Sequence, residues 1–203
     1  MDWITQIDLQ ILHMIAQYMH TAWLDQFMII FTTLGDGGAL WIVMGIYLLF
    51  FKNYRKAGVA ILLSLIVGFI VFNLGLKPMI ARIRPFIVDP SFQLLISAPK
   101  DYSFPSGHAW SSFAMVAVLF KEKIKGRYWV MGVASLMAFS RLYMTVHYPT
   151  DVVAGIILGL AVGYASIYAV NKYGPALMPK QWNIPESAYK STAEVSKNAI
   201  RSK

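Results

Sequence analysis

Three short segments hold the polar residues that could do chemistry in this otherwise apolar chain. The first, KPMIARIRP, places two basic residues, Lys77 and Arg84, seven positions apart. The second is Pro-Ser-Gly-His at residues 105–108, directly before an apolar run, and the third is SRLYMTVHYPTD at residues 140–151. Basic residues can hold an anion, and a histidine oriented by a carboxylate can attack it. The set therefore favours nucleophilic chemistry on a bound anion.

The first segment is expected near the end of a helix. On a continuous helix Lys77 and Arg84 would share one face, about 10.5 Å apart along the axis. Pro78 and Pro85 predict that the helix ends or bends here. Two basic residues at such an end commonly anchor to lipid head groups, so this segment alone is a weak indication of a site.

The second segment predicts the start of a helix. Ser106 is placed to act as its N-cap, and Gly107 allows a ligand to approach the exposed N–H groups of the first turn. The N-terminus of a helix attracts anions. His108 follows directly, so an ionisable side chain would stand beside the bound anion.

The third segment provides a histidine and a carboxylate at a second helix start. Pro149 and Thr150 predict helix entry and N-cap, which leaves His147 on the preceding loop and Asp151 in the first turn. A carboxylate that accepts a hydrogen bond from one ring nitrogen leaves the other nitrogen free as a nucleophile. A lone histidine at a membrane boundary is commonly a structural residue, but Arg141 and a second histidine favour a site.

The composition predicts an integral membrane protein of one domain. Of 203 residues, 57% are hydrophobic and only 14% are charged, too few charges for the surface of a soluble globule. The chain has no cysteine, which excludes disulfides and cysteine metal sites. Its net charge of +8 comes from basic residues in loops between apolar runs, so membrane topology explains the charge and no nucleic-acid partner is expected. The first ten residues lack the pattern of a cleavable signal peptide.

The predicted fold is all-α: a polytopic membrane bundle of five to six spanning helices with an N-terminal amphipathic helix. We expect an interfacial helix at residues 1–22, a membrane domain at 23–171 with its motifs at 77–151, and a polar cytoplasmic tail at 172–203. LGDGG at 34–38 interrupts the apolar stretch 23–51 and predicts a short helix feeding a kinked span. The apolar face of the first helix is assigned to Ile4, Ile7, Ile11, Met14, Ile15 and Tyr18. The later spans are expected at residues 56–76, 107–120, 128–146 and 151–171.

The basic loops predict the orientation. Residues 52–56, residues 121–127 and the tail are rich in Lys and Arg, and such loops stay on the cytoplasmic side. The connections 77–106 and 141–150, which hold the three polar segments, should then face the extracytoplasmic side of the cell membrane.

Taken together, the three segments resemble the motifs of the type 2 phosphatidic acid phosphatase superfamily. All three motifs are intact between residues 77 and 151. The matching residues are Lys77, Arg84-Pro85, Pro105-Ser106-Gly107-His108, Ser140-Arg141, His147 and Asp151.

The resemblance implies a role for each residue. His147 would attack the terminal phosphorus to form a phosphohistidine, Asp151 would orient it, and His108 would protonate the leaving oxygen and later activate water. The implied phosphate-binding residues are Lys77, Arg84, Ser106, Gly107 and Arg141. Fixed positive charge suits phosphoryl transfer, whose charge spreads over the equatorial oxygens. No metal or other cofactor is expected, because three cationic side chains can supply the positive charge and few carboxylates on that side could bind a metal.

The implied substrate is a lipid phosphate or diphosphate held at the level of the head groups. The compact chain and outward site are similar to bacterial undecaprenyl-diphosphate phosphatases of the superfamily, with phosphatidylglycerophosphate or phosphatidate as alternatives. The complete Lys77 and Gly107 set departs from some members of that subgroup, which keeps the alternatives open. Two rival functions come from other classes. One is a vanadium haloperoxidase, but those enzymes are soluble, and a chain this apolar argues against that function. The other is a non-enzymatic protein that binds or transports anionic lipid.

Overall fold

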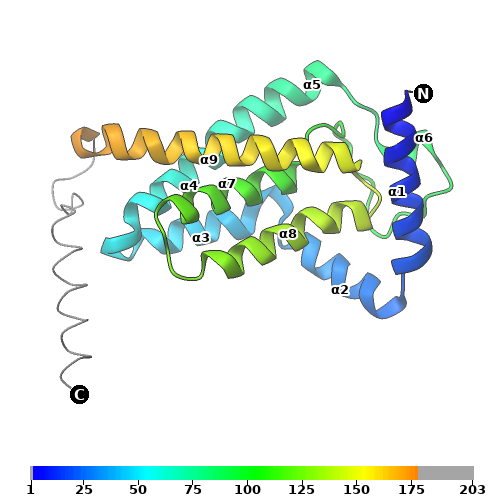
Figure 1. The fold of residues 1–203 in the computed structure, drawn as a ribbon, viewed down its shortest axis with the longest axis horizontal. Coiled ribbons are helices and arrows are strands. Elements are labelled where there is room, and N and C mark those ends of the chain that lie inside the picture. Colours follow the sequence, from blue (N-terminus) through cyan, green and yellow to red (C-terminus); the bar gives the residue numbers. More distant parts are fainter. Residues whose placement is uncertain (1, 178–203) are drawn as a thin grey trace.

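The computed structural model describes residues 2–177, which form helices and loops without a strand (Figure 1). The all-α prediction is therefore confirmed for the described part of the chain. The α-helices are α1 (Trp3–Met19), α2 (Ala22–Thr33), α3 (Ala39–Leu49), α4 (Arg55–Gly68), α5 (Lys77–Ile80), α6 (Pro85–Val88), α7 (Gly107–Lys121), α8 (Arg127–Tyr143) and α9 (Pro149–Leu177). Single turns of 3-10 helix cover Asp36–Gly38 and Lys52–Tyr54, and a π-helical segment, Phe69–Leu76, joins α4 to α5.

Two helical stretches, Lys52–Val88 and Pro149–Gly174, are long and apolar enough to cross a membrane. A third span is possible if α2 and the segment Asp36–Leu49, which meet at a bend of 44°, cross the membrane together. The predicted five to six spans are not confirmed. Helix α7 has 15 residues and α8 has 17, or about 22 and 25 Å of helix, less than a core of about 30 Å requires.

The predicted helix boundaries differ from the structure at the end of α8 and at both ends of α9. Helix α8 stops at Tyr143, three residues early, because Thr145 takes a positive φ of 52°. Pro149 is the first residue of α9, so Thr150 lies in the first turn and is not the N-cap. The helix continues to Leu177, beyond the predicted end of this span at residue 171. The polar cytoplasmic tail at 172–203 stays a prediction, and residues 178–203 lie outside the described part.

The bend between α2 and α3 has a local cause. Gly37 and Gly38 both adopt positive φ, 60° and 73°, a conformation that glycine reaches without the steric cost of a Cβ. The sequence LGDGG therefore forms the predicted hinge. The hinge also lies beside the large cavity described below, because Gly35, Asp36, Gly37 and Gly38 line it.

The core is built around α7, which packs against α9, α8 and α4. Its contact with α9 is close because small residues of α9 face it. A Cβ added to Gly159 or Gly163 would overlap the carbonyl oxygen of Trp110 or Ala114. Stripes of small residues allow backbones to approach in this way in membrane helices, so α7 and α9 hold the site's helix starts at a fixed separation.

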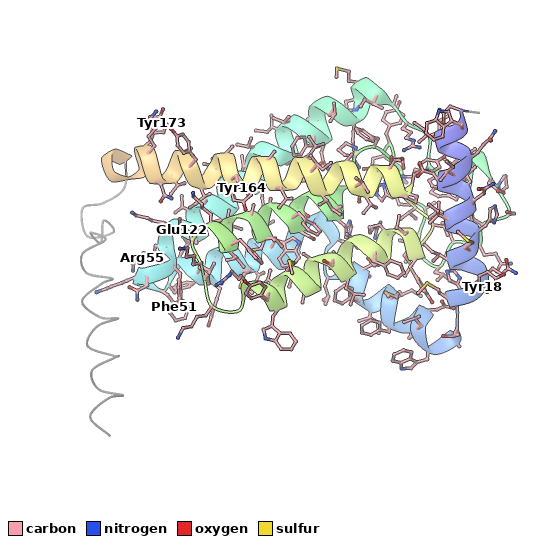
Figure 2. All side chains as sticks on the ribbon, in the orientation of Figure 1. Tyr18, Phe51, Arg55, Glu122, Tyr164 and Tyr173 are labelled. Atoms are coloured by element: carbon pink, nitrogen blue, oxygen red, sulfur yellow. The ribbon has the colours of Figure 1, made fainter. Side chains whose placement is uncertain are left out.

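Helix α1 lies across the end of the bundle at which α9 begins (Figure 1). Its buried residues are Asp8, Leu9, Leu12 and Ile15, whereas Ile4, Ile7, Met14 and Tyr18 of the predicted apolar face are exposed. Figure 2 shows Tyr18 at this end of the molecule and Phe51, Arg55 and Glu122 at the other. The helix thus has one face against the bundle and one apolar face outward. That it lies in the membrane interface stays a prediction.

Candidate active site

The three polar segments meet at one cavity, which has a volume of about 1120 Å³. One part of its lining is polar, and another is apolar, with Ile42, Leu62, Leu65, Ile66 and Phe69. Six of the eight predicted site residues line the cavity: Lys77, Arg84, Gly107, His108, Arg141 and His147. Ser106 and Asp151, both fully buried, lie behind them.

Arg84 is the most highly connected cation of the cavity. Its side chain is 3% exposed, and it donates to the main-chain oxygens of Asp101 and Val146, at 2.8 and 2.5 Å. Its Nη2 also pairs with the Asp101 carboxylate at 2.6 Å. The guanidinium is therefore fixed to two loops at once, which gives a planar donor group a defined orientation.

Lys77 reaches the same carboxylate as Arg84, although the two residues do not share a helix. Helix α5 ends at Ile80, and Ala81 takes a left-handed conformation with φ 50°. The helix thus ends between the two residues, as Pro78 and Pro85 predicted, and Lys77 and Arg84 do not share a helical face. The Lys77 ammonium and the Arg84 guanidinium instead converge on Asp101.

Asp101 is a site residue that the motifs did not identify. It pairs with both cations, while its side chain is 52% exposed. Burial raises the pKa of the Asp101 carboxyl, but the contacts with Lys77 and Arg84 outweigh burial and lower this pKa to about 2. The carboxylate is thus negatively charged at neutral pH and occupies cations that are suited to phosphate.

His147, on the loop after α8, and Asp151, in the first turn of α9, are buried side by side. The Nδ1 of His147 is 3.5 Å from Asp151 Oδ2 and makes no hydrogen bond. The other nitrogen, Nε2, faces Arg84 Nη1 at 3.4 Å. The two groups are adjacent, but the predicted hydrogen bond between them is not formed in the structure, and the orienting role of Asp151 stays a prediction.

The pKa of His147 is well below its ordinary value. Burial lowers the pKa of this imidazole to about 3, and the nearby Arg84 and Arg141 add to the effect, although Asp151 opposes it. The ring is therefore neutral at physiological pH. A neutral ring has a lone pair on one nitrogen, and Nε2 is the nitrogen on the cavity side.

Arg141 and His108 meet at the end of α2. Arg141 Nη1 donates to Thr32 Oγ1 at 2.6 Å, and its Nε is buried without a partner. His108 Nε2 lies 3.2 Å from the main-chain oxygen of Thr32 and 3.2 Å from Asp36 Oδ1. The hinge segment thus provides a carboxylate to His108, which the sequence patterns did not indicate.

Ser106 is the N-cap of α7, as predicted, but its side chain makes no capping hydrogen bond. Its hydroxyl is buried and has no partner. A Cβ on Gly107 would meet no atom within 4 Å, so space is open beside the first turn of the helix. The unpartnered hydroxyl and the N–H groups at the open start of the helix can together donate hydrogen bonds to an oxygen of a ligand.

Two further charged residues lie behind the cavity and do not line it. Arg82 donates to Asp151 and Asp8, and it does not line the cavity. Asp8 is 2% exposed. The sequence does contain an indication of this buried carboxylate, because Asp8 lies at helical spacing from the apolar residues Ile4 and Leu12.

With this geometry in place, comparison with known proteins gives a consistent family. The family model of the PAP2 superfamily matches residues 53–175. The undecaprenyl-diphosphatase of Sulfolobus acidocaldarius is 36% identical over 141 residues, which cover 67% of this chain and 66% of that protein. The chain thus spans slightly less than two thirds of this relative's length. Phosphatidylglycerophosphatase B of Bacillus subtilis is 31% identical over 160 residues, 71% of this chain and 74% of that one.

A solved structure shares the fold. The transmembrane PAP2 type phosphatidylglycerolphosphate phosphatase from Bacillus subtilis superposes with a TM-score of 0.67 at 24% identity, covering 85% of this chain and 88% of that chain. At this identity the likeness is one of fold.

Proposed function

Since this chain belongs to the PAP2 superfamily, we propose that it is an integral-membrane lipid phosphatase that removes the terminal phosphate of a lipid phosphate or diphosphate. The observation that carries the proposal is the placement of His147. One ring nitrogen points to the buried Asp151, and the other faces an Arg84-lined cavity. This is the arrangement of a nucleophile with an orienting group behind it.

In the first half of the proposed reaction, the phosphate of the substrate lies among Lys77, Arg84 and Arg141. These cations, with the Ser106 hydroxyl and the first turn of α7, would hold its three non-bridging oxygens. The lone pair of His147 Nε2 forms a bond to phosphorus as the bond from phosphorus to the leaving oxygen breaks. His108 gives a proton to that oxygen, and the dephosphorylated lipid leaves.

In the second half, water replaces the lipid beside His108. His108 accepts a proton from this water, whose oxygen attacks phosphorus and breaks the P–N bond. Inorganic phosphate leaves, and His147 returns to its neutral state. No step calls for a metal ion, because the three fixed cations compensate the charge of the phosphoryl group.

The shape of the cavity supports a lipid substrate. Its polar lining can take the phosphate, while Ile42, Ile66 and Phe69 of the apolar lining are 39%, 59% and 50% exposed. A hydrocarbon chain can therefore extend from the phosphate toward the bilayer. We propose undecaprenyl diphosphate as the substrate, by likeness to the relative from Sulfolobus acidocaldarius, with phosphatidylglycerophosphate as the alternative that the relative from Bacillus subtilis supports.

The test is phosphate release by the purified protein in detergent with EDTA. Undecaprenyl diphosphate, phosphatidylglycerophosphate and phosphatidate are offered in parallel. We expect release from one of them, and we expect His147→Ala to lower kcat by at least about 10³-fold. His13→Ala is the matched control, because His13 bonds Asp89 outside the cavity.

Each other outcome removes a part of the proposal. A strict requirement for Mg²⁺ would refute metal independence. Full activity in His147→Ala would refute the phosphohistidine. No release from any substrate by folded protein would favour the lipid-binding or transport function instead.

A further inference from the structure

We propose that Asp8 and Arg82 are positioning residues that hold Asp151, and through it His147, in the orientation the reaction needs. This inference rests on the proposed phosphatase function. Neither residue lines the cavity, and neither is among the residues that match the family motifs, although Arg82 lies within the first segment. Their contacts form a chain of charged groups that runs from α1 to the start of α9.

Arg82 is the central residue of this series of charged contacts. Its Nη1 donates to Asp151 Oδ1 at 2.6 Å and to Thr150 Oγ1 at 2.7 Å, and its Nη2 donates to Asp8 Oδ2 at 2.9 Å. The guanidinium also stacks on Tyr148, with 3.9 Å from its central carbon to the ring centroid. A planar fork held at several points has little freedom to rotate.

Asp8 fixes the other end of the guanidinium. Its carboxylate accepts from the main-chain N–H of Thr150 at 3.1 Å and from the hydroxyl of the same residue. The Asp8 side chain is 2% exposed. A buried carboxylate requires such partners to offset its lost hydration. Helix α1 is therefore joined by charge to the first turn of α9, which carries Asp151.

The consequence for Asp151 is that both carboxylate oxygens are occupied. Oδ1 accepts from Arg82, and Oδ2 accepts from the Ser103 hydroxyl and from the Tyr148 N–H, the latter at 3.0 Å. The carboxylate cannot rotate without breaking these bonds. Its Oδ2 is thereby held 3.5 Å from His147 Nδ1, while Nε2 on the other side of the ring faces Arg84 Nη1.

The test compares Asp8→Asn and Arg82→Lys with wild type in the phosphate-release assay. Asn keeps the size of Asp but removes the charge that faces Arg82, and Lys keeps the charge of Arg but loses the fork. We expect kcat to fall by about 10- to 100-fold, with KM and the inhibition constant for vanadate nearly unchanged, because the ring is misplaced while the cations stay. Asp2→Asn is the control, since Asp2 caps the same helix and is exposed.

A second variant covers the case in which the charge changes prevent folding. Thr150→Val removes the hydroxyl between Arg82 and Asp8 and leaves both charges in place; it should lower kcat several-fold with vanadate inhibition retained. If the folded variants keep the wild-type kcat, this inference is wrong and the proposed function still stands. Joint loss of kcat, vanadate inhibition and thermal stability would show a merely structural role. Absence of activity in wild type would overturn the proposed function, and this inference with it.

Discussion

At the scale of single residues, Asp101 decides how the cavity receives an anion. Its carboxylate lies on Lys77 and Arg84, the two cations that we assign to phosphate. An incoming phosphate must displace it, and after hydrolysis the carboxylate can return to the cations as inorganic phosphate leaves. An internal carboxylate of this kind weakens the binding of every anion at the site, product included.

This competition predicts the effect of Asp101→Asn. Removal of the charge should lower the inhibition constants for inorganic phosphate and vanadate about tenfold, the scale of one lost charge-assisted hydrogen bond. The measurement is inhibition of phosphate release by each anion. Asp89→Asn is the control, because Asp89 pairs with His13 away from the cavity. Weaker inhibition in Asp101→Asn would instead mean that Asp101 mainly holds the two cations in place.

The residues of the cavity differ in how far the sequence could predict them. Lys77, His108 and His147 stand in short contiguous motifs, so their neighbours in sequence are also their neighbours in the site. Asp101 and Asp36 stand in loops without periodicity, and only tertiary folding brings them to the cations and to His108. The separation of the His147 and Asp151 side chains likewise depends on the backbone conformation of the loop that leads into α9.

At the scale of elements, hydrophobic periodicity predicted the helices well and their ends poorly. Apolar runs mark most of α4, α7, α8 and α9, because those residues pack in the core or face lipid. The end of α8 depends on a positive φ at Thr145, and the start of α9 at Pro149 depends on contacts made by Tyr148 and Thr150. Such local backbone geometry leaves little trace in an apolar pattern. The predicted apolar residues Ile4, Ile7, Met14 and Tyr18 of α1 point away from the bundle, and that this face meets the membrane interface stays a prediction.

The packing of α7 on α9 makes a prediction at this scale. Gly159→Ala places a Cβ against the carbonyl of Trp110, so the helices must separate, at a cost of about 1–3 kcal/mol in the free energy of unfolding. We expect a lower melting temperature in detergent. Activity should fall too, because α7 begins beside His108 and α9 begins beside Asp151.

Gly132→Ala is the matched control for this variant. Gly132 lies on α8 with no atom within 4 Å of an added Cβ, so the same chemical change meets open space. This variant should keep the melting temperature and the activity of wild type. Equal melting temperatures for the two variants would contradict close packing of α7 on α9.

At the scale of the whole molecule, the two ends of the bundle differ in character. One end holds α1, α6 and the start of α9 (Figure 1), and Arg84 and His147 lie just before α6 and α9 in the chain. The opposite end holds the basic loops near Arg55 and Glu122 (Figure 2). Basic loops favour the cytoplasmic side, whereas the site cations at the other end are held by Asp101, Thr32 and main-chain oxygens. Their positive charge therefore reflects the site and does not contradict an outward-facing cavity.

This orientation can be measured directly because the chain contains no cysteine. Ala98→Cys lies in the loop before α7, near the cavity, and Lys125→Cys lies between α7 and α8; both positions are exposed. A membrane-impermeant maleimide should label the first in intact cells and the second only after permeabilisation. The reverse pattern would place the cavity on the cytoplasmic side. Labelling of both from one side would contradict a bundle whose two ends lie across the membrane.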